Sequence, residues 1–123
     1  MDEGLATRLR AAFNARDIDT LRSLLAKDAT WGEDPNGDSF CHDRDAIVRH
    51  LKRLLAEGVR PTIVKTTTGP RGIAASLEVE WPDPEHAPPD RITFCQVYVV
   101  TDGLVTEIYG HDDEDSALVA ISD

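Results

Sequence analysis

The polar residue with the clearest chemical potential in this sequence is a glutamine inside an apolar strand. Alternate side chains of the segment Ile92–Val100 fall on two faces, and Gln96 is the only long polar residue on its face. A buried amide needs hydrogen-bond partners, which either the protein or a bound ligand can supply. We therefore expect Gln96 to contact a ligand, with a structural hydrogen bond as the alternative.

Apolar side chains that could surround this amide occur in several predicted helices and strands. Many apolar groups around a few polar ones are typical of small-molecule sites, although aromatic residues also build ordinary cores. We expect these residues to line a ligand-sized cavity: Phe13, Trp31, Leu51, Phe94 and Tyr98.

Patterns for nucleophilic or metal chemistry are missing from the sequence. His42 follows Cys41, but no second base or orienting carboxylate stands at a suitable position for a nucleophilic pair. The four histidines do not have a metal-ligand spacing such as His-x-x-x-His. We predict neither a metal nor a cofactor.

Three helices are expected in the first half of the chain. The segment Glu3–Ala15 has apolar residues at i, i+4, i+7 and i+8, which is the stripe of a half-buried helix. Asp17 suits the N-cap of a second helix. Asp43 or Asp45 can cap a third, which Gly58 ends.

The hydrophobic period changes from helical to alternating in the second half of the chain. A short extended piece is expected at Ala29–Trp31, and Asp102-Gly103 predicts a two-residue hairpin turn. Helices followed by antiparallel strands indicate an α+β fold, here one domain over residues 1–123. The predicted strands are Thr62–Thr68, Ile73–Trp81, Arg91–Thr101 and Leu104–Gly110.

The strand Arg91–Thr101 is unusual because both of its faces are largely apolar. Helices can cover only one face of an antiparallel sheet, so we predict that a second copy of the chain covers the other. This homodimer would bury Cys95, Val97 and Val99. The alternative is a central strand whose outer row is partly exposed.

The composition narrows the classes of partner and compartment. With 13 Lys+Arg against 23 Asp+Glu, the net charge is −10, which argues against nucleic acid or an anionic membrane as partner. No apolar run approaches the ~18 residues of a membrane span. Two distant cysteines indicate reduced thiols, so we predict a cytoplasmic protein.

Three segments resemble the superfamily of ketosteroid isomerases, SnoaL-like polyketide cyclases and nuclear transport factor 2. The opening helical pair of the superfamily is similar to Phe13–Leu21 and Leu24–Trp31 of this chain. Its acidic loop and the start of its third helix are similar to Glu33–Gly37 and His42–Ile47, and its last hairpin is similar to Tyr98–Val105. The resemblance implies a cone in which three N-terminal helices pack on a curved antiparallel sheet around a pocket. It also implies pairing of subunits through the outer sheet face.

The resemblance implies roles for two aspartates. The general base of ketosteroid isomerases lies in the loop before the third helix, where Asp34 matches best, and a base of this kind needs apolar surroundings. Polyketide cyclases use an acidic residue near the end of the last strand, where Asp112 is closest. Each has a structural alternative, since Asp34 precedes the turn sequence Pro35-Asn36-Gly37 and Asp112 begins an acidic run.

The sequence departs from the resembled enzymes at other positions. The two oxyanion donors of the isomerases correspond to Leu9 and Gln96, and the contiguous Asp43-Arg44-Asp45 does not supply the Asp-Arg-Asp trio of epoxide hydrolases. The expected function is binding of a small, largely apolar molecule, as an isomerase or cyclase. A non-catalytic ligand-binding or protein-interaction module is the alternative, because one fold serves both.

Overall fold

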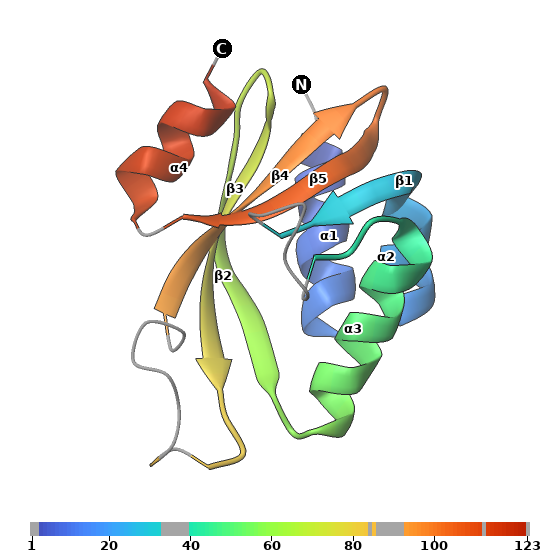
Figure 1. The fold of residues 1–123 in the computed structure, drawn as a ribbon. Coiled ribbons are helices and arrows are strands. Elements are labelled where there is room, and N and C mark those ends of the chain that lie inside the picture. Colours follow the sequence, from blue (N-terminus) through green and yellow to red (C-terminus); the bar gives the residue numbers. More distant parts are fainter. Residues whose placement is uncertain (1–2, 33–39, 84, 86–92, 112, 123) are drawn as a thin grey trace.

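The helices and strands follow the predicted order along the chain. The structure is a computed structural model that describes residues 3–32, 40–83, 85, 93–111 and 113–122. Figure 1 shows an α+β arrangement, which confirms the predicted class. Its helices are α1 (Glu3–Asn14), α2 (Ile18–Leu24), α3 (Arg44–Ala56) and α4 (Glu114–Ile121), and its strands are β1 (Leu25–Trp31), β2 (Arg60–Thr68), β3 (Gly72–Glu80), β4 (Thr93–Thr101) and β5 (Leu104–His111).

Aspartates cap three of the helices. Asp17, Asp43 and Asp113 each accept a backbone N–H from the first turn of α2, α3 and α4, at 3.2, 2.8 and 2.7 Å. Asp43 is therefore the cap of α3. Its neighbour Asp45 instead pairs with Arg22 of α2 at 3.0 Å.

The described strands form one curved sheet in the order β1-β5-β4-β3-β2. Strands β2 to β5 are antiparallel neighbours, whereas β1 runs parallel to β5. The sheet is thus mixed, and the prediction of a wholly antiparallel sheet was wrong at this edge. The extended piece is also longer than Ala29–Trp31 because the chain becomes extended at Leu25, which lies beside Val105 of β5.

The hairpin between β4 and β5 has the predicted two-residue turn. Asp102 and Gly103 have φ angles of 53° and 81°, both in the left-handed region. Turns of this kind match the twist of the flanking strands, and aspartate and glycine tolerate the conformation well.

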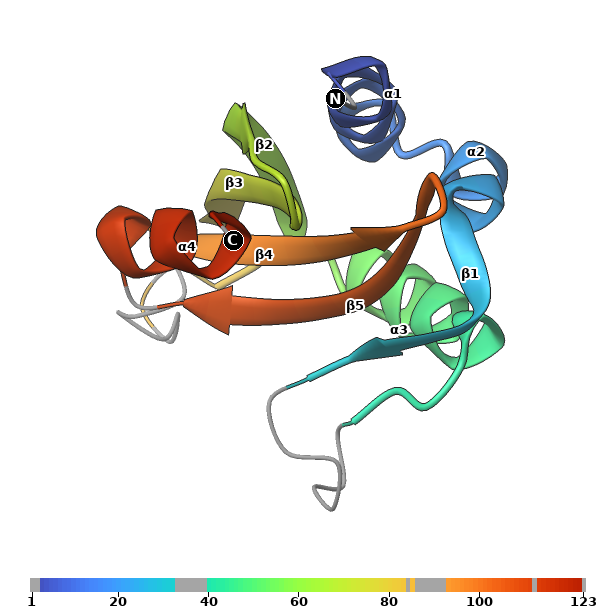
Figure 2. The same cartoon turned by 90° about the horizontal axis from the view of Figure 1, so that it is seen from above.

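The main core lies between the sheet and the three N-terminal helices. Seen from above, α1, α2 and α3 lie on one side of the sheet and α4 on the other (Figure 2). The largest fully buried side chains of this core come from both layers: Leu5, Leu9, Ile47, Ile63, Ile73, Leu77 and Val105. Among the described helices, none is long and apolar enough to cross a membrane.

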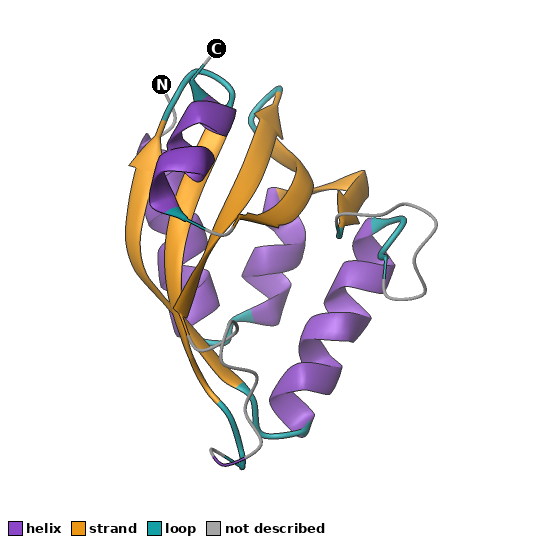
Figure 3. Ribbon diagram, turned by 60° about the vertical axis from the view of Figure 1, so that its left-hand side comes forward, coloured by secondary structure: helices purple, strands orange, loops and turns teal. Residues whose placement is uncertain are grey.

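The outer face of the sheet carries α4, as Figure 3 also shows. Val97 of β4 is 0% exposed and packs with Ala117 and Ile121 of this helix. The helix is also attached to the β2–β3 hairpin, since the Arg71 N–H donates to the Ile121 carbonyl at 3.0 Å. An ion pair from Lys65 to the first turn of α4, at 2.5 Å, adds a second attachment.

This arrangement corrects the argument for a second copy on the outer face. Cys95 and Val99 are partly buried and pack on the same cluster as Val97, so the chain itself covers part of the apolar row. Val97 is not available to a partner while α4 is in place. The homodimer stays a prediction. The apolar outer face of β4 no longer supports it, because α4 covers part of that face.

Candidate functional site

The inner face of β4 presents the predicted glutamine to the helices. Gln96 is 3% exposed, and its neighbours on the adjacent strands are Ala75 of β3 and Gly110 of β5. Alanine has only a methyl group and glycine has no side chain, so neither neighbour covers the amide of Gln96 from the adjacent strands. A long polar side chain therefore stands among the smallest residues of its row.

A tyrosine two residues further along β4 fixes the orientation of this amide. The Tyr98 hydroxyl donates a hydrogen bond to Gln96 Oε1. Burial raises the pKa of Tyr98, which keeps the hydroxyl protonated and able to donate. Because Oε1 is the acceptor, the amide nitrogen of Gln96 keeps its two N–H donors.

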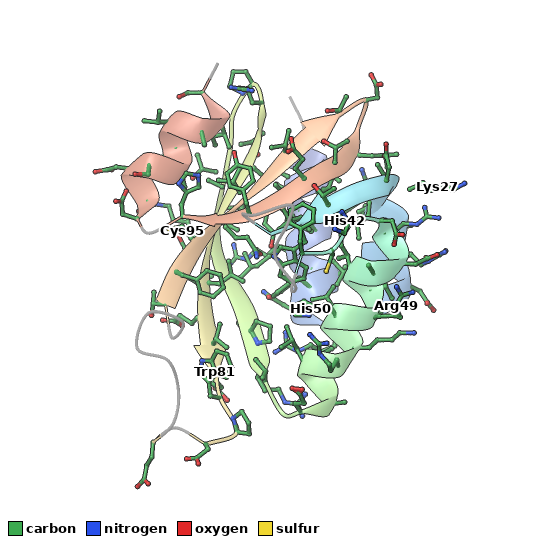
Figure 4. All side chains as sticks on the ribbon, in the orientation of Figure 1. Lys27, His42, Arg49, His50, Trp81 and Cys95 are labelled. Atoms are coloured by element: carbon green, nitrogen blue, oxygen red, sulfur yellow. The ribbon has the colours of Figure 1, made fainter. Side chains whose placement is uncertain are left out.

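A second group of side chains gathers where β1 ends and α3 passes it. Trp31 pairs with Ile108 of β5, and its backbone exchanges two hydrogen bonds with Cys41, at 3.0 and 2.8 Å. The ring of His50 on α3 meets the Trp31 ring edge-on, with centroids 5.0 Å apart. Arg53, one turn later, contacts His50 Nδ1 through Nη2 at 2.7 Å. Figure 4 shows His50 on the side of α3 that faces the sheet.

The surroundings of His50 favour its neutral form. Partial burial lowers the pKa of His50, the positive charge of Arg53 lowers it further, and Glu57 opposes them. A guanidinium has donors only, so Nδ1 must be the acceptor and the ring proton lies on Nε2. Gln96 and His50 are thus two side chains that carry hydrogen-bond donors, on the amide nitrogen and on Nε2.

Cys41 is unsuited to nucleophilic chemistry. Burial raises the pKa of the Cys41 thiol, even though Arg53 and Arg49 act in the opposite direction. A thiol reacts mainly as its thiolate, which this environment disfavours. Cys41 and Cys95 are both free thiols.

The residues expected to line a cavity fall into two groups. Phe94 and Trp31 are partly buried against the core cluster that contains Tyr98, on the inner face of the sheet. Phe13 and Leu51 line a different feature, a small apolar recess that is open to solvent, between the N-terminal helices and the start of β2. The remaining residues of the recess are Arg16, Ile18, Leu21, Leu54, Leu55 and Pro61.

The two candidate catalytic aspartates, Asp34 and Asp112, lie outside the described residues. The position that corresponds to the isomerase tyrosine holds Leu9, which is 2% exposed in the core. Asp43 and Asp45 are engaged in the helix cap and the ion pair described above, and both have exposed side chains.

The contact between His50 and Arg53 was not predicted from the sequence. A signal existed, since Ile47, His50 and Leu54 recur at i, i+3 and i+7, which places the histidine beside the buried stripe of its helix. The contact with Trp31 joins elements distant in the sequence and could not be read from spacing.

Comparisons with known proteins identify the family and the fold. Residues 6–108 match the SnoaL-like domain. A protein provisionally named a polyketide cyclase, from Sinorhizobium meliloti, is 16% identical with a TM-score of 0.68, over 88% of this chain and 94% of that chain. One provisionally named a ketosteroid isomerase, from Kribbella flavida, is 22% identical with a TM-score of 0.64, over 87% and 73%.

A third solved structure represents another activity on the same fold. The epoxide hydrolase of limonene-epoxide-hydrolase type from M. tuberculosis is 17% identical with a TM-score of 0.60, over 95% of this chain and 81% of that chain. Identities this low establish the fold alone. No curated protein matches the chain.

Proposed function

This chain belongs to the SnoaL-like domain family, and from that premise we propose that it binds a small, largely apolar organic molecule against the inner face of β4. The observation that carries the proposal is the buried amide of Gln96 between Ala75 and Gly110. An amide at such a position fixes the orientation of a ligand, while the apolar walls provide most of the buried contact area.

The chemistry of the donors indicates the kind of ligand. Tyr98 occupies the carbonyl oxygen of Gln96, so the amide offers N–H groups to a ligand oxygen that accepts. A carbonyl or hydroxyl oxygen on an apolar skeleton fits this requirement. The net charge of −10 supports a small-molecule ligand over nucleic acid, and the free thiols support a cytoplasmic location.

We propose further that the protein acts as an isomerase or cyclase of this ligand. Such an active site needs hydrogen-bond donors that stabilise a developing oxyanion, and we assign this role to Gln96 and His50. It also needs a base that removes a proton beside the carbonyl. Asp34 or Asp112 would have that role, on the resemblance to isomerases and cyclases stated above.

A non-catalytic binding module is the second candidate. It is favoured by the hydrogen bond from Tyr98 to Gln96, because an amide with a partner in the protein needs no ligand to satisfy its oxygen. In that case the aspartates take no part in chemistry.

One experiment separates these functions. The apolar, enolisable ketone 2-tetralone is incubated with the protein in D2O, and exchange of its α-protons is followed by NMR together with the protein amide shifts. We expect exchange above the buffer rate, with roughly a hundredfold loss in Asp34→Asn or Asp112→Asn, within the range that general bases contribute.

The control variant is Asp102→Asn, the same chemical change at an exposed hairpin turn whose left-handed backbone also suits asparagine. It should exchange at the wild-type rate. Amide shifts on β4 without exchange would favour the binding module, and wild-type protein with neither shifts nor exchange would contradict the proposed function.

A further inference from the structure

A donor on α3 extends this proposed function. We propose that His50 donates a hydrogen bond from Nε2 to the oxygen of the bound ligand, and that Arg53 is the positioning residue that holds His50 in the required tautomer. The inference rests on the proposed function, and it narrows the ligand to a carbonyl compound or its enol form, whose oxygen gains negative charge.

The first step is the identity of the proton on the ring. Arg53 Nη2 lies 2.7 Å from His50 Nδ1, which is a hydrogen-bond distance. Arginine cannot accept, so Nδ1 accepts and the neutral ring carries its proton on Nε2. Adding a second ring proton would destroy this bond and place two positive charges together.

The second step is the location of the ring. His50 is half-buried against Trp31 of β1, with the rings 5.0 Å apart at 85°. Figure 4 shows His50 on the side of α3 toward the sheet, whereas Arg49, the preceding residue, is exposed to solvent. The imidazole therefore lies on the sheet-facing side of α3, against β1 of the same sheet whose inner face carries Gln96 and Tyr98.

The third step is the chemistry that such a donor supplies. A neutral imidazole N–H can polarise a carbonyl without giving up its proton, since the resulting imidazolate is unfavourable. Its hydrogen bond with Arg53 withdraws charge from the ring and strengthens the Nε2 donor. The site then has two donors, from α3 and β4, although Leu9 offers none from α1.

The alternative is that His50 and Arg53 only form a pair at spacing i, i+3 on the helix surface. The two roles differ in measurable ways. A surface pair gives some bias in tautomer but no dependence of ligand affinity on the imidazole N–H.

The first test is nitrogen-15 NMR of the His50 ring in the wild type, Arg53→Met and Arg49→Met. We expect the wild-type shifts of a neutral ring protonated on Nε2, an upward shift of the His50 pKa in Arg53→Met, and no change in the tautomer in Arg49→Met. The last variant removes a charge from the same helix without removing a bond to His50. A wild-type ring protonated on Nδ1 would overturn the inference.

The second test is fluorescence titration with 2-naphthol, an apolar molecule whose single oxygen mimics an enol. His50→Phe keeps a ring beside Trp31 but loses the donor, so affinity should fall roughly tenfold, as expected for one hydrogen bond to a partly charged oxygen. His50→Gln restores an N–H donor and should recover most of the affinity.

The outcomes separate this inference from the proposed function. Unchanged affinity in His50→Phe, together with weaker binding in Gln96→Leu, would overturn the role of His50 and leave the binding function in place. Wild-type protein that does not bind 2-naphthol would overturn both.

Discussion

At the scale of single residues, Gln96 was predictable and its partner was not. A lone amide in an apolar row indicates a buried polar group, and the structure buries it. The pattern could not show that Tyr98, two positions along the same face, would supply a hydroxyl donor. It also could not show that Ala75 and Gly110 would flank the amide, because strand register depends on contacts between distant segments.

The hydrogen bond between Tyr98 and Gln96 makes a prediction about stability. Gln96→Leu leaves the buried Tyr98 hydroxyl without its acceptor, which should lower the free energy of unfolding by ~1–3 kcal/mol. The double variant Gln96→Leu, Tyr98→Phe removes both polar groups and should recover much of this loss. Urea denaturation of the wild type, both single variants and the double variant measures the coupling energy. Strictly additive effects would contradict the hydrogen bond.

At the scale of elements, helices with clear caps and stripes were predicted well, and elements defined by their neighbours were not. Asp17 and Asp43 begin α2 and α3 as expected, since a cap is a local interaction. In contrast, β1 forms by pairing with β5, about 80 positions away in a parallel arrangement that no local pattern specifies. Nor could a local pattern show that α4, at the end of the described chain, would cover the outer face of β4.

The packing of α4 on the sheet makes a second prediction. Ile121 is 3% exposed against β3 and β4, so Ile121→Ala should destabilise the protein by ~2–5 kcal/mol. Val119 of the same helix is 73% exposed, and Val119→Ala should change stability by less than ~0.5 kcal/mol. Chemical denaturation of both variants is the measurement. Equal effects would show that α4 does not pack on the outer face in solution.

At the scale of the whole molecule, the order of helical and alternating patterns was enough to predict the α+β class, because segregated helices and strands have few compact arrangements. The cone itself was expected only from the resemblance to the superfamily. The site was predicted only in part. The expected lining residues divide between the inner sheet face, with Phe94 and Tyr98, and the recess between the helices, with Phe13 and Leu51. Residue type alone cannot assign an apolar residue to the inner sheet face or to the recess, since large apolar side chains line both.

The central claim is that a ligand binds against β4, and its location is the most direct test. Isotope-filtered NOE spectroscopy of the protein with 2-tetralone shows which side chains lie next to the bound molecule. We expect NOEs from the ketone to Phe94, Gln96 and Tyr98 on the inner face of β4. NOEs confined to Phe13 and Leu54 in the helical recess, or no intermolecular NOEs at all, would contradict the account.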